Sequence, residues 1–359
     1  MDVKQFSGDK ILFHLERVEE FLSTGKSRPI TIEFDMTNLC NHNCPFCYGY
    51  YNRKENKSHL SKEEAIRYIT QLKAAGVIAV MFSGGGDPLM NRNTIDVMEY
   101  AKSLDLDVAL ITNGLAMDAK TSERAIKICT WIRVSVDADN EETYHKTHGV
   151  SKQAWETMLT NVRELVSLKK NTGSSCTIGV GYLTTKDTIS REKMLKFTRK
   201  FKELGVDYSQ FRPLMPKWEE NKQVDPDPSL DIIKECVKEA APGYDVLYSK
   251  PKYEFMDKPR AEWRPYGICL GVNFTTVISA DSKVYVCCHH RGIEKYCLGD
   301  LRKETFGQIW ERRQKTFTKI DFRDCPYFCR NNPFNMLLWE MKNGKKFSRK
   351  GKAVHENFL

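Results

Sequence analysis

The sequence predicts an α/β protein whose strands lie parallel in one sheet. Strand-like apolar patterns occupy residues 30–36, 77–83, 107–112, 131–136, 176–183 and 207–212. Helix-like patterns lie near residues 62–75, 91–103, 117–128, 152–170 and 188–204. Because the two kinds of segment alternate, the chain is expected to consist of β-α units around a parallel sheet. The periodicity alone does not separate an open sheet from a barrel.

Local signals support individual elements. Apolar residues recur at helical spacing between residues 12 and 22, which predicts a helix in the lead-in of residues 1–29. The run from Val77 to Phe82 is continuously apolar, as expected of a strand covered on both faces. Ser61, with Glu64 three positions later, predicts a capping box at a helix start.

Composition narrows the class of protein. The 359 residues suffice for one large domain or two ordinary ones. With no membrane-length apolar run and no signal-peptide layout at the start, we expect a cytoplasmic protein that binds neither membrane nor nucleic acid. Twelve cysteines then indicate metal or redox chemistry rather than disulfides. The net charge of +9 is compatible with an anionic substrate such as a phosphorylated sugar or nucleotide, and equally with a Lys-rich surface.

Three cysteines follow the first predicted strand. Cys40, Cys44 and Cys47 have the spacing C-x3-C-x2-C in a loop that also contains Asn, His and Pro. A structural zinc site usually closes with a fourth protein ligand. A cubane iron–sulfur cluster on three thiolates instead keeps one iron free for an exogenous ligand. Zinc, or a chance grouping, is the alternative.

With Phe46 at the aromatic position, this loop resembles the C-x3-C-x-aromatic-C signature of the radical S-adenosylmethionine (SAM) superfamily. The resemblance implies a [4Fe-4S] cluster on the three cysteines, SAM bound to the fourth iron, and reductive cleavage of SAM to a 5′-deoxyadenosyl radical. It also implies a partial (β/α)6 TIM-like barrel over residues 30–215.

The second predicted strand ends in the glycines Gly84, Gly85 and Gly86, followed by Asp87. Consecutive glycines let the backbone approach a ligand closely, although a tight turn uses them as well. The stretch is similar to the family's Gly-Gly-Glu motif, which holds the amino group of SAM. Asp87 stands where Glu is usual and is one methylene shorter, which puts contact through its own carboxylate in doubt.

Three later residues complete the predicted SAM pocket. Asn113 follows the third strand, whose end lines the pocket in the family, although Asn-Gly is also a generic turn. Ser135 and Asp137 share one face of the fourth strand and resemble the Ser-x-Asp pair of SPASM/Twitch enzymes. An Asx-type turn is the alternative for this pair.

Candidates for catalysis are few. Arg212 ends the sixth strand, where an Arg can hold a carboxylate or phosphate with two hydrogen bonds, unless it forms a surface salt bridge. Tyr48 and Tyr182 are candidates from their positions only.

A second group of cysteines lies in the last quarter of the chain. Its members are Cys269, Cys287, Cys288, Cys297, Cys325 and Cys329. Cys269 and Cys287 bracket a predicted hairpin, and Cys325 and Cys329 return later with the spacing C-x3-C. Two pairs from separate segments suit a second iron–sulfur cluster, and a zinc site with four thiolates would use the same layout.

Residues 267–335 resemble a SPASM/Twitch domain, through Cys287-Cys288 after the hairpin and the segments 298–301 and 306–310. Ser282 stands where Gly is usual, and the central cysteine group of a full SPASM domain is missing. The resemblance therefore implies the shorter Twitch version, with one auxiliary [4Fe-4S] cluster. Its implied ligands are Cys269, Cys287, Cys325 and Cys329, with Cys297 in reserve.

The domain organisation expected from these signals has five parts. They are a helical lead-in (1–29), a radical SAM partial barrel (30–215), a linker with a helix (216–266), the auxiliary cluster domain (267–335) and a basic tail (336–359). Within this tail, the Lys-rich stretch 342–352 is expected to be solvated.

The resemblance implies an enzyme that abstracts hydrogen from a small hydroxyl-rich substrate, such as a sugar, aminocyclitol or nucleotide sugar. The auxiliary cluster would accept the electron left on the substrate. An electron donor such as flavodoxin or ferredoxin would be its partner. The alternatives are a peptide- or protein-modifying SPASM enzyme, disfavoured by the short lead-in, a redox-neutral dehydratase, epimerase or decarboxylase, and a non-enzymatic zinc or iron–sulfur protein.

Overall fold

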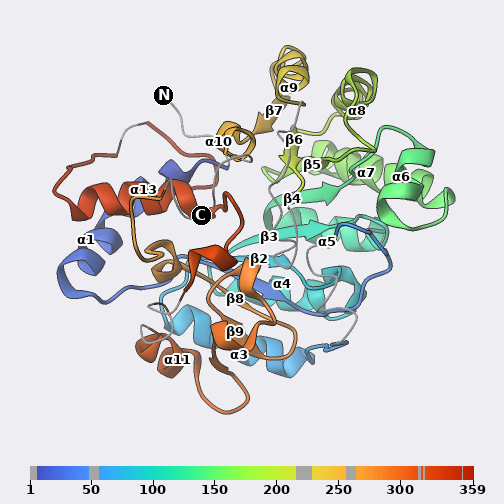
Figure 1. Cartoon of the computed structure of the whole chain (residues 1–359). Coiled ribbons are helices and arrows are strands. Elements are labelled where there is room, and N and C mark those ends of the chain that lie inside the picture. Colours follow the sequence, from blue (N-terminus) through green and yellow to red (C-terminus); the bar gives the residue numbers. More distant parts are fainter. Residues whose placement is uncertain are drawn as a thin grey trace.

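The structure is a computed structural model that describes residues 6–47, 56–215, 229–255, 264–313, 317, 320–349 and 351–359. Its described strands form one ten-stranded sheet in the order β10-β9-β8-β1-β2-β3-β4-β5-β6-β7. The sheet curves around a central space, with helices outside it (Figure 1). β10 and β7 are its two edges, so the sheet forms a partial barrel rather than a closed one.

All six predicted strands are present. They are β1 (Thr31–Asp35), β2 (Ala79–Ser83), β3 (Asp107–Thr112), β4 (Cys129–Ser135), β5 (Thr177–Thr184) and β6 (Tyr208–Pro213), each parallel to the next. The five predicted helices are α3 (Lys62–Ala74), α4 (Thr94–Ser103), α5 (Ala119–Ile128), α7 (Gln153–Thr172) and α8 (Arg191–Leu204). Ser61 and Glu64 form the expected capping box on α3. The predicted α/β class and partial barrel are therefore confirmed.

Other elements extend this prediction. In the lead-in, a 3-10 helix η1 (Gly8–His14) precedes α1 (Leu15–Thr24). A further helix, α6 (Glu141–His148), follows β4, and β7 (Asp245–Tyr248) adds a seventh strand parallel to β6. A 3-10 helix, η2 (Pro88–Met90), precedes α4. Beyond β6 lie α9 (Ser229–Val237), α10 (Lys250–Glu254), α11 (Phe306–Arg312), α13 (Asn331–Lys342), η3 (Gly271–Asn273), η4 (Cys288–His290), η5 (Glu294–Tyr296) and η6 (Phe322–Asp324).

The C-terminal cysteine region is joined directly to the barrel sheet. β8 (Thr275–Ile278) pairs in parallel with β1, and the hairpin continues through β9 (Lys283–Tyr285) to β10 (Cys297–Asp300). At the hairpin turn Ser282 has a φ of 66°, in the left-handed region that favours glycine. The hydroxyl of Ser282 accepts a hydrogen bond from Tyr68 (3.0 Å). This conformation accounts for the glycine expected at that position.

The described residues of the basic stretch 342–352 are mostly exposed, as expected of a solvated segment, but the residues that follow pack against the barrel. Phe358 is buried, and its ring lies 5.5 Å from that of Trp131, centroid to centroid. The backbone N–H of Leu359 donates to Thr31 Oγ1 (3.0 Å), and Asn357 Nδ2 donates to Asp107 Oδ2 (2.7 Å). Thr31 and Asp107 begin β1 and β3, so this segment packs at the amino ends of the strands.

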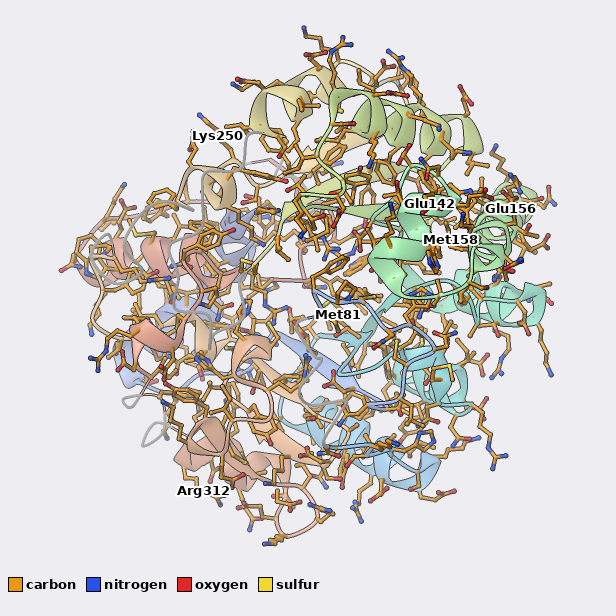
Figure 2. All side chains as sticks on the ribbon, turned by 45° about the vertical axis from the view of Figure 1, so that its right-hand side comes forward. Met81, Glu142, Glu156, Met158, Lys250 and Arg312 are labelled. Atoms are coloured by element: carbon orange, nitrogen blue, oxygen red, sulfur yellow. The ribbon has the colours of Figure 1, made fainter. Side chains whose placement is uncertain are left out.

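Apolar side chains fill the space between strands and helices, and charges lie outside. Met158 of α7 is fully buried, whereas Glu142, Glu156 and Arg312 extend from the periphery (Figure 2). Among the described helices, none has the length and apolar character needed to cross a membrane.

Candidate active site

A cavity of about 530 Å³ runs through the barrel interior, from Thr31 and Phe358 near the amino ends of the strands to the carboxyl ends, where α/β barrels carry their sites. Its volume is in the usual range for ligand pockets. Most of the sequence-predicted site residues line it: Cys40, Cys44, Phe46, Cys47, Gly84, Gly86, Asp87, Asn113, Ser135, Asp137 and Arg212. The parallel strands thus bring together residues that are far apart in the sequence.

The first three cysteines share one loop after β1. All three are half-buried and line the cavity. Asn113 Nδ2 lies 3.9 Å from Cys40 Sγ, and the backbone N–H of His42 donates to the same sulfur (3.4 Å). Three soft sulfur donors on one wall of a ligand-sized cavity fit a cluster that leaves one iron for a small molecule.

Two histidines that the sequence analysis did not single out support this loop. His148, at the end of α6, places Nδ1 3.3 Å from Cys44 Sγ and 3.2 Å from His42 Nδ1. The other ring nitrogen of His148 lies 2.7 Å from the carbonyl oxygen of Val136, which accepts its hydrogen bond. Burial lowers the pKa of His148, so the ring is neutral and this bond selects its tautomer. Nothing in the sequence spacing connects His42 with His148.

The glycine run packs against the cysteine loop. The backbone N–H of Gly86 donates to Thr37 O (3.0 Å), and that of Asp87 donates to Leu39 O (2.9 Å). A Cβ at Gly86 would collide with Leu39 O, and a Cβ at Gly85 would collide with the side chain of Asn38. Gly85 therefore faces the loop rather than the cavity, whereas Gly84 and Gly86 line the cavity.

The carboxylate of Asp87 is occupied by the chain itself. It accepts hydrogen bonds from Thr112 Oγ1 (2.9 Å), the backbone N–H of Asn113 (2.7 Å) and that of Leu89 (3.0 Å). Burial raises the pKa of Asp87, and these hydrogen bonds oppose that shift. Asp87 thus joins the end of β2 to the end of β3, which agrees with the doubt about its direct contact with SAM.

Arg212 and Asp137 face each other across the cavity wall. Arg212 Nη2 lies 4.0 Å from Asp137 Oδ1, and that oxygen also accepts from the backbone N–H of Leu183 (2.6 Å). Asp137 has a φ of 49°, so it lies just beyond β4 in a left-handed conformation. A Cβ at Gly181 would lie 3.1 Å from Arg212 Nη2, so the small residue leaves space for the guanidinium.

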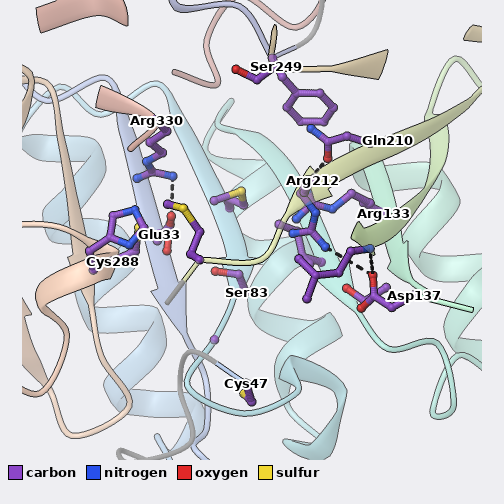
Figure 3. Close-up of a pocket in the computed structure, with 18 of the residues that line it drawn as sticks. Glu33, Cys47, Ser83, Arg133, Asp137, Gln210, Arg212, Ser249, Cys288 and Arg330 are labelled. Atoms are coloured by element: carbon purple, nitrogen blue, oxygen red, sulfur yellow. Dashed lines mark hydrogen bonds and ion pairs between the residues drawn. The ribbon is translucent and has the colours of Figure 1, made fainter. Parts of the chain in front are cut away.

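Two more cations line the cavity. Arg133 of β4 donates from Nη1 to Gln210 Oε1 (2.7 Å), beside Arg212 (Figure 3). Lys252, from α10, is the other. Burial, with Arg212 nearby, lowers the pKa of Arg133 to about 9 and that of Lys252 to about 8. Strand alternation with Ser135 could have indicated Arg133, whereas Lys252 lies in a region without a clear pattern.

The opposite wall carries paired charges. Arg291 contacts Glu33 (3.0 Å) and Asp35 (2.6 Å), and Arg330 also contacts Glu33. Figure 3 shows Glu33, Arg330 and Cys288 across the cavity from Arg133 and Arg212. The two arginines keep the pKa of Glu33 below its ordinary value despite burial.

The four predicted auxiliary ligands line a second, smaller cavity. They are Cys269, Cys287, Cys325 and Cys329. Burial raises the pKa of Cys287 well above its ordinary value, and the charges of its cysteine neighbours raise it further. Thiols close enough to affect one another in this way fit a site with four thiolate ligands. Cys297 does not line this cavity, and its sulfur contacts Gly299 O (3.5 Å).

Tyr182 requires a correction. Its hydroxyl donates to Thr188 O (2.8 Å), and its fully buried ring packs against Phe197 and Phe211 (4.6 and 5.4 Å between centroids). It does not line the cavity, so the structure places it in the core and the prediction of a catalytic role is wrong. Tyr48 lies outside the described residues.

Comparison with known families agrees with this architecture. Residues 34–189 match the radical SAM superfamily, and residues 269–332 match the iron–sulfur cluster-binding SPASM domain. The chain belongs to the radical SAM superfamily and carries a C-terminal SPASM-type domain. It is therefore an enzyme that uses SAM and [4Fe-4S] clusters.

Curated relatives differ in activity. The AdoMet-dependent heme synthase of Methanosarcina barkeri is 26% identical over 319 residues, covering 81% of this chain and 84% of its own. The dTDP-4-amino-4,6-dideoxy-D-glucose ammonia-lyase of Streptomyces venezuelae is 25% identical, with 58% of this chain and 46% of its own covered. For an S-adenosylmethionine-dependent nucleotide dehydratase of Lacinutrix mariniflava (28% identical), these shares are 37% and 28%. The chain thus spans less than half of these last two relatives.

Two solved structures share the fold. Streptococcus suis SuiB bound to the precursor peptide SuiA has a TM-score of 0.65 at 14% identity, with 85% of this chain and 70% of that chain covered. AdoMet-bound anSMEcpe has a TM-score of 0.60 at 17% identity, with 88% and 99% covered.

Proposed function

We propose that this enzyme oxidises a small, hydroxyl-rich substrate, such as a sugar, aminocyclitol or nucleotide sugar, inside the 530 Å³ cavity. When bound, the first cluster and SAM supply the 5′-deoxyadenosyl radical, and the auxiliary cluster accepts one electron. The substrate loses a hydrogen atom, an electron and a proton, so an alcohol leaves as a carbonyl compound. Reducing electrons come from a donor such as flavodoxin or ferredoxin.

The chain's own residues divide into three groups in this proposal. Cys40, Cys44 and Cys47 hold the SAM cluster, and Phe46 lies beside it. SAM contacts come from the backbone of the glycine run, from Asn113, and from Ser135 and Asp137. The auxiliary cluster is held by Cys269, Cys287, Cys325 and Cys329.

One observation supports the proposal that the substrate is oxidised. Cys288, His289 and Arg330 line both the main cavity and the auxiliary cysteine cavity. A substrate in the main cavity is therefore separated from the auxiliary site by one layer of side chains. Such a short separation suits removal of an electron from the substrate radical.

The cavity walls suit a polar substrate. Ser83, Ser135 and Gln210 offer hydroxyl and amide groups that hydrogen-bond to sugar hydroxyls. Phe211 and Phe328 line the same cavity and help to keep water away from a reactive radical.

A haem precursor is the second candidate substrate. The alignment with the heme synthase covers most of both chains. This favours a common architecture that includes both the barrel and the auxiliary region. Fe-coproporphyrin III, the compound named in a second M. barkeri relative that is 28% identical over 38% of this chain, is a concrete test compound.

The test is a screen of the anaerobically reconstituted enzyme with SAM, dithionite and a panel of sugars, aminocyclitols, nucleotide sugars and Fe-coproporphyrin III. We expect one compound to raise 5′-deoxyadenosine formation and to lose two hydrogens, with one product per 5′-deoxyadenosine. A product of unchanged oxidation state would contradict the proposed oxidation.

A further inference from the structure

We infer that Arg133, Arg212 and Lys252 form a subsite that binds a phosphate group of the substrate. The inference deepens the proposed function and rests on it for the idea that a substrate occupies this cavity. Its evidence is a local excess of positive charge, unpartnered nitrogens and the form of the side chains.

The excess appears when the two sides of the cavity are compared. On one side Arg291 and Arg330 face Glu33 and Asp35, so two cations meet two carboxylates. Each of these two cations contacts a carboxylate directly.

The other side is not balanced. Arg133, Arg212 and Lys252 all line the cavity, and only the Arg212 guanidinium lies within 4.0 Å of a carboxylate, that of Asp137, which also accepts from a backbone N–H. Asp87 is a second lining carboxylate, and its hydrogen bonds from neutral donors do not cancel its charge. Three cations against two carboxylates leave one positive charge for an anionic ligand to balance.

Among the described residues, unpartnered guanidinium nitrogens occur on both sides of the cavity, on Arg330 opposite and on Arg133 and Arg212 here. Arg133 is buried, with only 8% of its surface exposed, and lines the cavity. Its Nη1 is bound to Gln210, but within the described part of the chain its Nε has no hydrogen-bond partner. The Nε of Arg212 is also buried and likewise has no hydrogen-bond partner among the described residues. Buried donors of this kind are normally satisfied, so a ligand group is the expected partner.

The residue types favour a tetrahedral oxyanion. Two guanidinium forks and one ammonium can share three oxygens, through paired and single charge-assisted hydrogen bonds. A phosphate monoester carries roughly −1.5 to −2 at pH 7 and has three terminal oxygens that accept hydrogen bonds, so all three side chains can bind it at once. A carboxylate has only two oxygens for the same three side chains.

SAM also has a carboxylate, and Arg212 lies beside Asp137 in the proposed SAM pocket. If the positive charge of Arg212 instead binds the carboxylate of SAM, loss of Arg212 would weaken SAM binding and leave phosphate binding unchanged. The test therefore measures both ligands separately.

The variants are Lys252→Met and Arg212→Gln, with Lys250→Met as the matched control. Lys250 lies on the same short helix, but its side chain is 62% exposed and reaches Glu254 (3.2 Å) outside the cavity (Figure 2). Each methionine variant removes one charge from α10, so a general electrostatic effect would be equal in the two.

The direct readout is ligand binding to the reconstituted enzyme, by calorimetry and by the rise in Tm. Inorganic phosphate, succinate and chloride are compared at equal ionic strength. We expect phosphate to bind wild type and Lys250→Met alike, and to bind Lys252→Met and Arg212→Gln about 10- to 100-fold more weakly. Preference for succinate over phosphate, with the same variants impaired, would support an oxyanion subsite that takes a carboxylate and overturn the choice of phosphate.

Equal phosphate binding by all four proteins would overturn the subsite. So would a loss of SAM affinity in Arg212→Gln with phosphate binding retained. Because these measurements need no turnover, they are independent of the oxidation assay. Phosphate binding without any oxidised product would contradict the proposed function and leave the subsite in place.

Discussion

The cysteines of the first site lie on one loop between residues 40 and 47, whereas those of the auxiliary site come from separate segments between residues 269 and 329. The first three are half-buried and face a cavity large enough for ligands. The auxiliary four line a smaller cavity to which residues of η4 and α13 also contribute. A site that must admit SAM keeps one side open, and a site that only transfers electrons can be enclosed.

The largest effect is expected at the open site. Cys40→Ala leaves two thiolates on the loop, so we expect 5′-deoxyadenosine formation to fall by more than the roughly 10- to 100-fold that loss of a partner outside the ligands costs a metal site. Cys176→Ala is the control, because burial raises the pKa of this core thiol to about 12 and keeps it inert. SAM cleavage that survives in Cys40→Ala would show that the open site is not the SAM site.

Loss of a ligand from the enclosed auxiliary site should affect a different step of the reaction. In Cys325→Ala we expect 5′-deoxyadenosine formation to continue, whereas the oxidised product is lost. Cys297→Ala should retain both activities, since its sulfur contacts Gly299 O away from the auxiliary cavity. Product analysis by mass spectrometry checks this pair. Undiminished oxidation by Cys325→Ala would separate the auxiliary site from the reaction.

A substitution in the glycine run tests how tightly this run packs against the loop that carries the first three cysteines. Gly86→Ala introduces a Cβ that collides with Leu39 O, so we expect a loss of about 1–3 kcal/mol in the free energy of unfolding and reduced iron uptake. Gly307→Ala in α11 has open space around the new methyl group and should instead stabilise the protein by about 0.5–1 kcal/mol. Urea unfolding of both variants measures the difference. Equal values would mean that the loop adapts freely.

The smallest expected effect is a pH dependence of anion binding, which tests the role of Lys252 in the cavity. Burial, Arg212 and Arg133 lower the pKa of Lys252 to about 8, while Cys329 and Cys288 act in the opposite direction. An anion binds the ammonium form, so affinity is full below pH 8 and declines as the pH rises through 8. We expect sulfate, whose charge is constant in this range, to bind about 10-fold more weakly at high pH. Lys252→Met should lose this dependence, and an unchanged profile would contradict the assignment.

The sequence predicted those structural features that depend on residues close together in the chain. Strand and helix positions from β1 to β6 depend on local apolar patterns, and the cysteine loop is contiguous, so both could be predicted. The parallel pairing of β8 with β1 joins residues far apart in the sequence, and no local pattern indicates it.

Side-chain direction explains the remaining differences. Tyr182 and Gly181 are neighbours on β5, yet only Gly181 borders the Arg212 guanidinium, while Tyr182 points into the core. The charge of the stretch 342–352 indicates its exposure, but nothing in that pattern indicates that Phe358, further along, is buried against Trp131. His148 reaches Cys44 only because α6 returns to the cysteine loop.

The most direct test of the two-site account is an iron count on three anaerobically reconstituted proteins. Two cubane clusters predict about eight irons in wild type and about four in each of Cys40→Ala and Cys325→Ala, with SAM cleavage lost only in the first variant. Bound zinc in place of iron, or about four irons in wild type with no further loss in Cys325→Ala, would contradict the account.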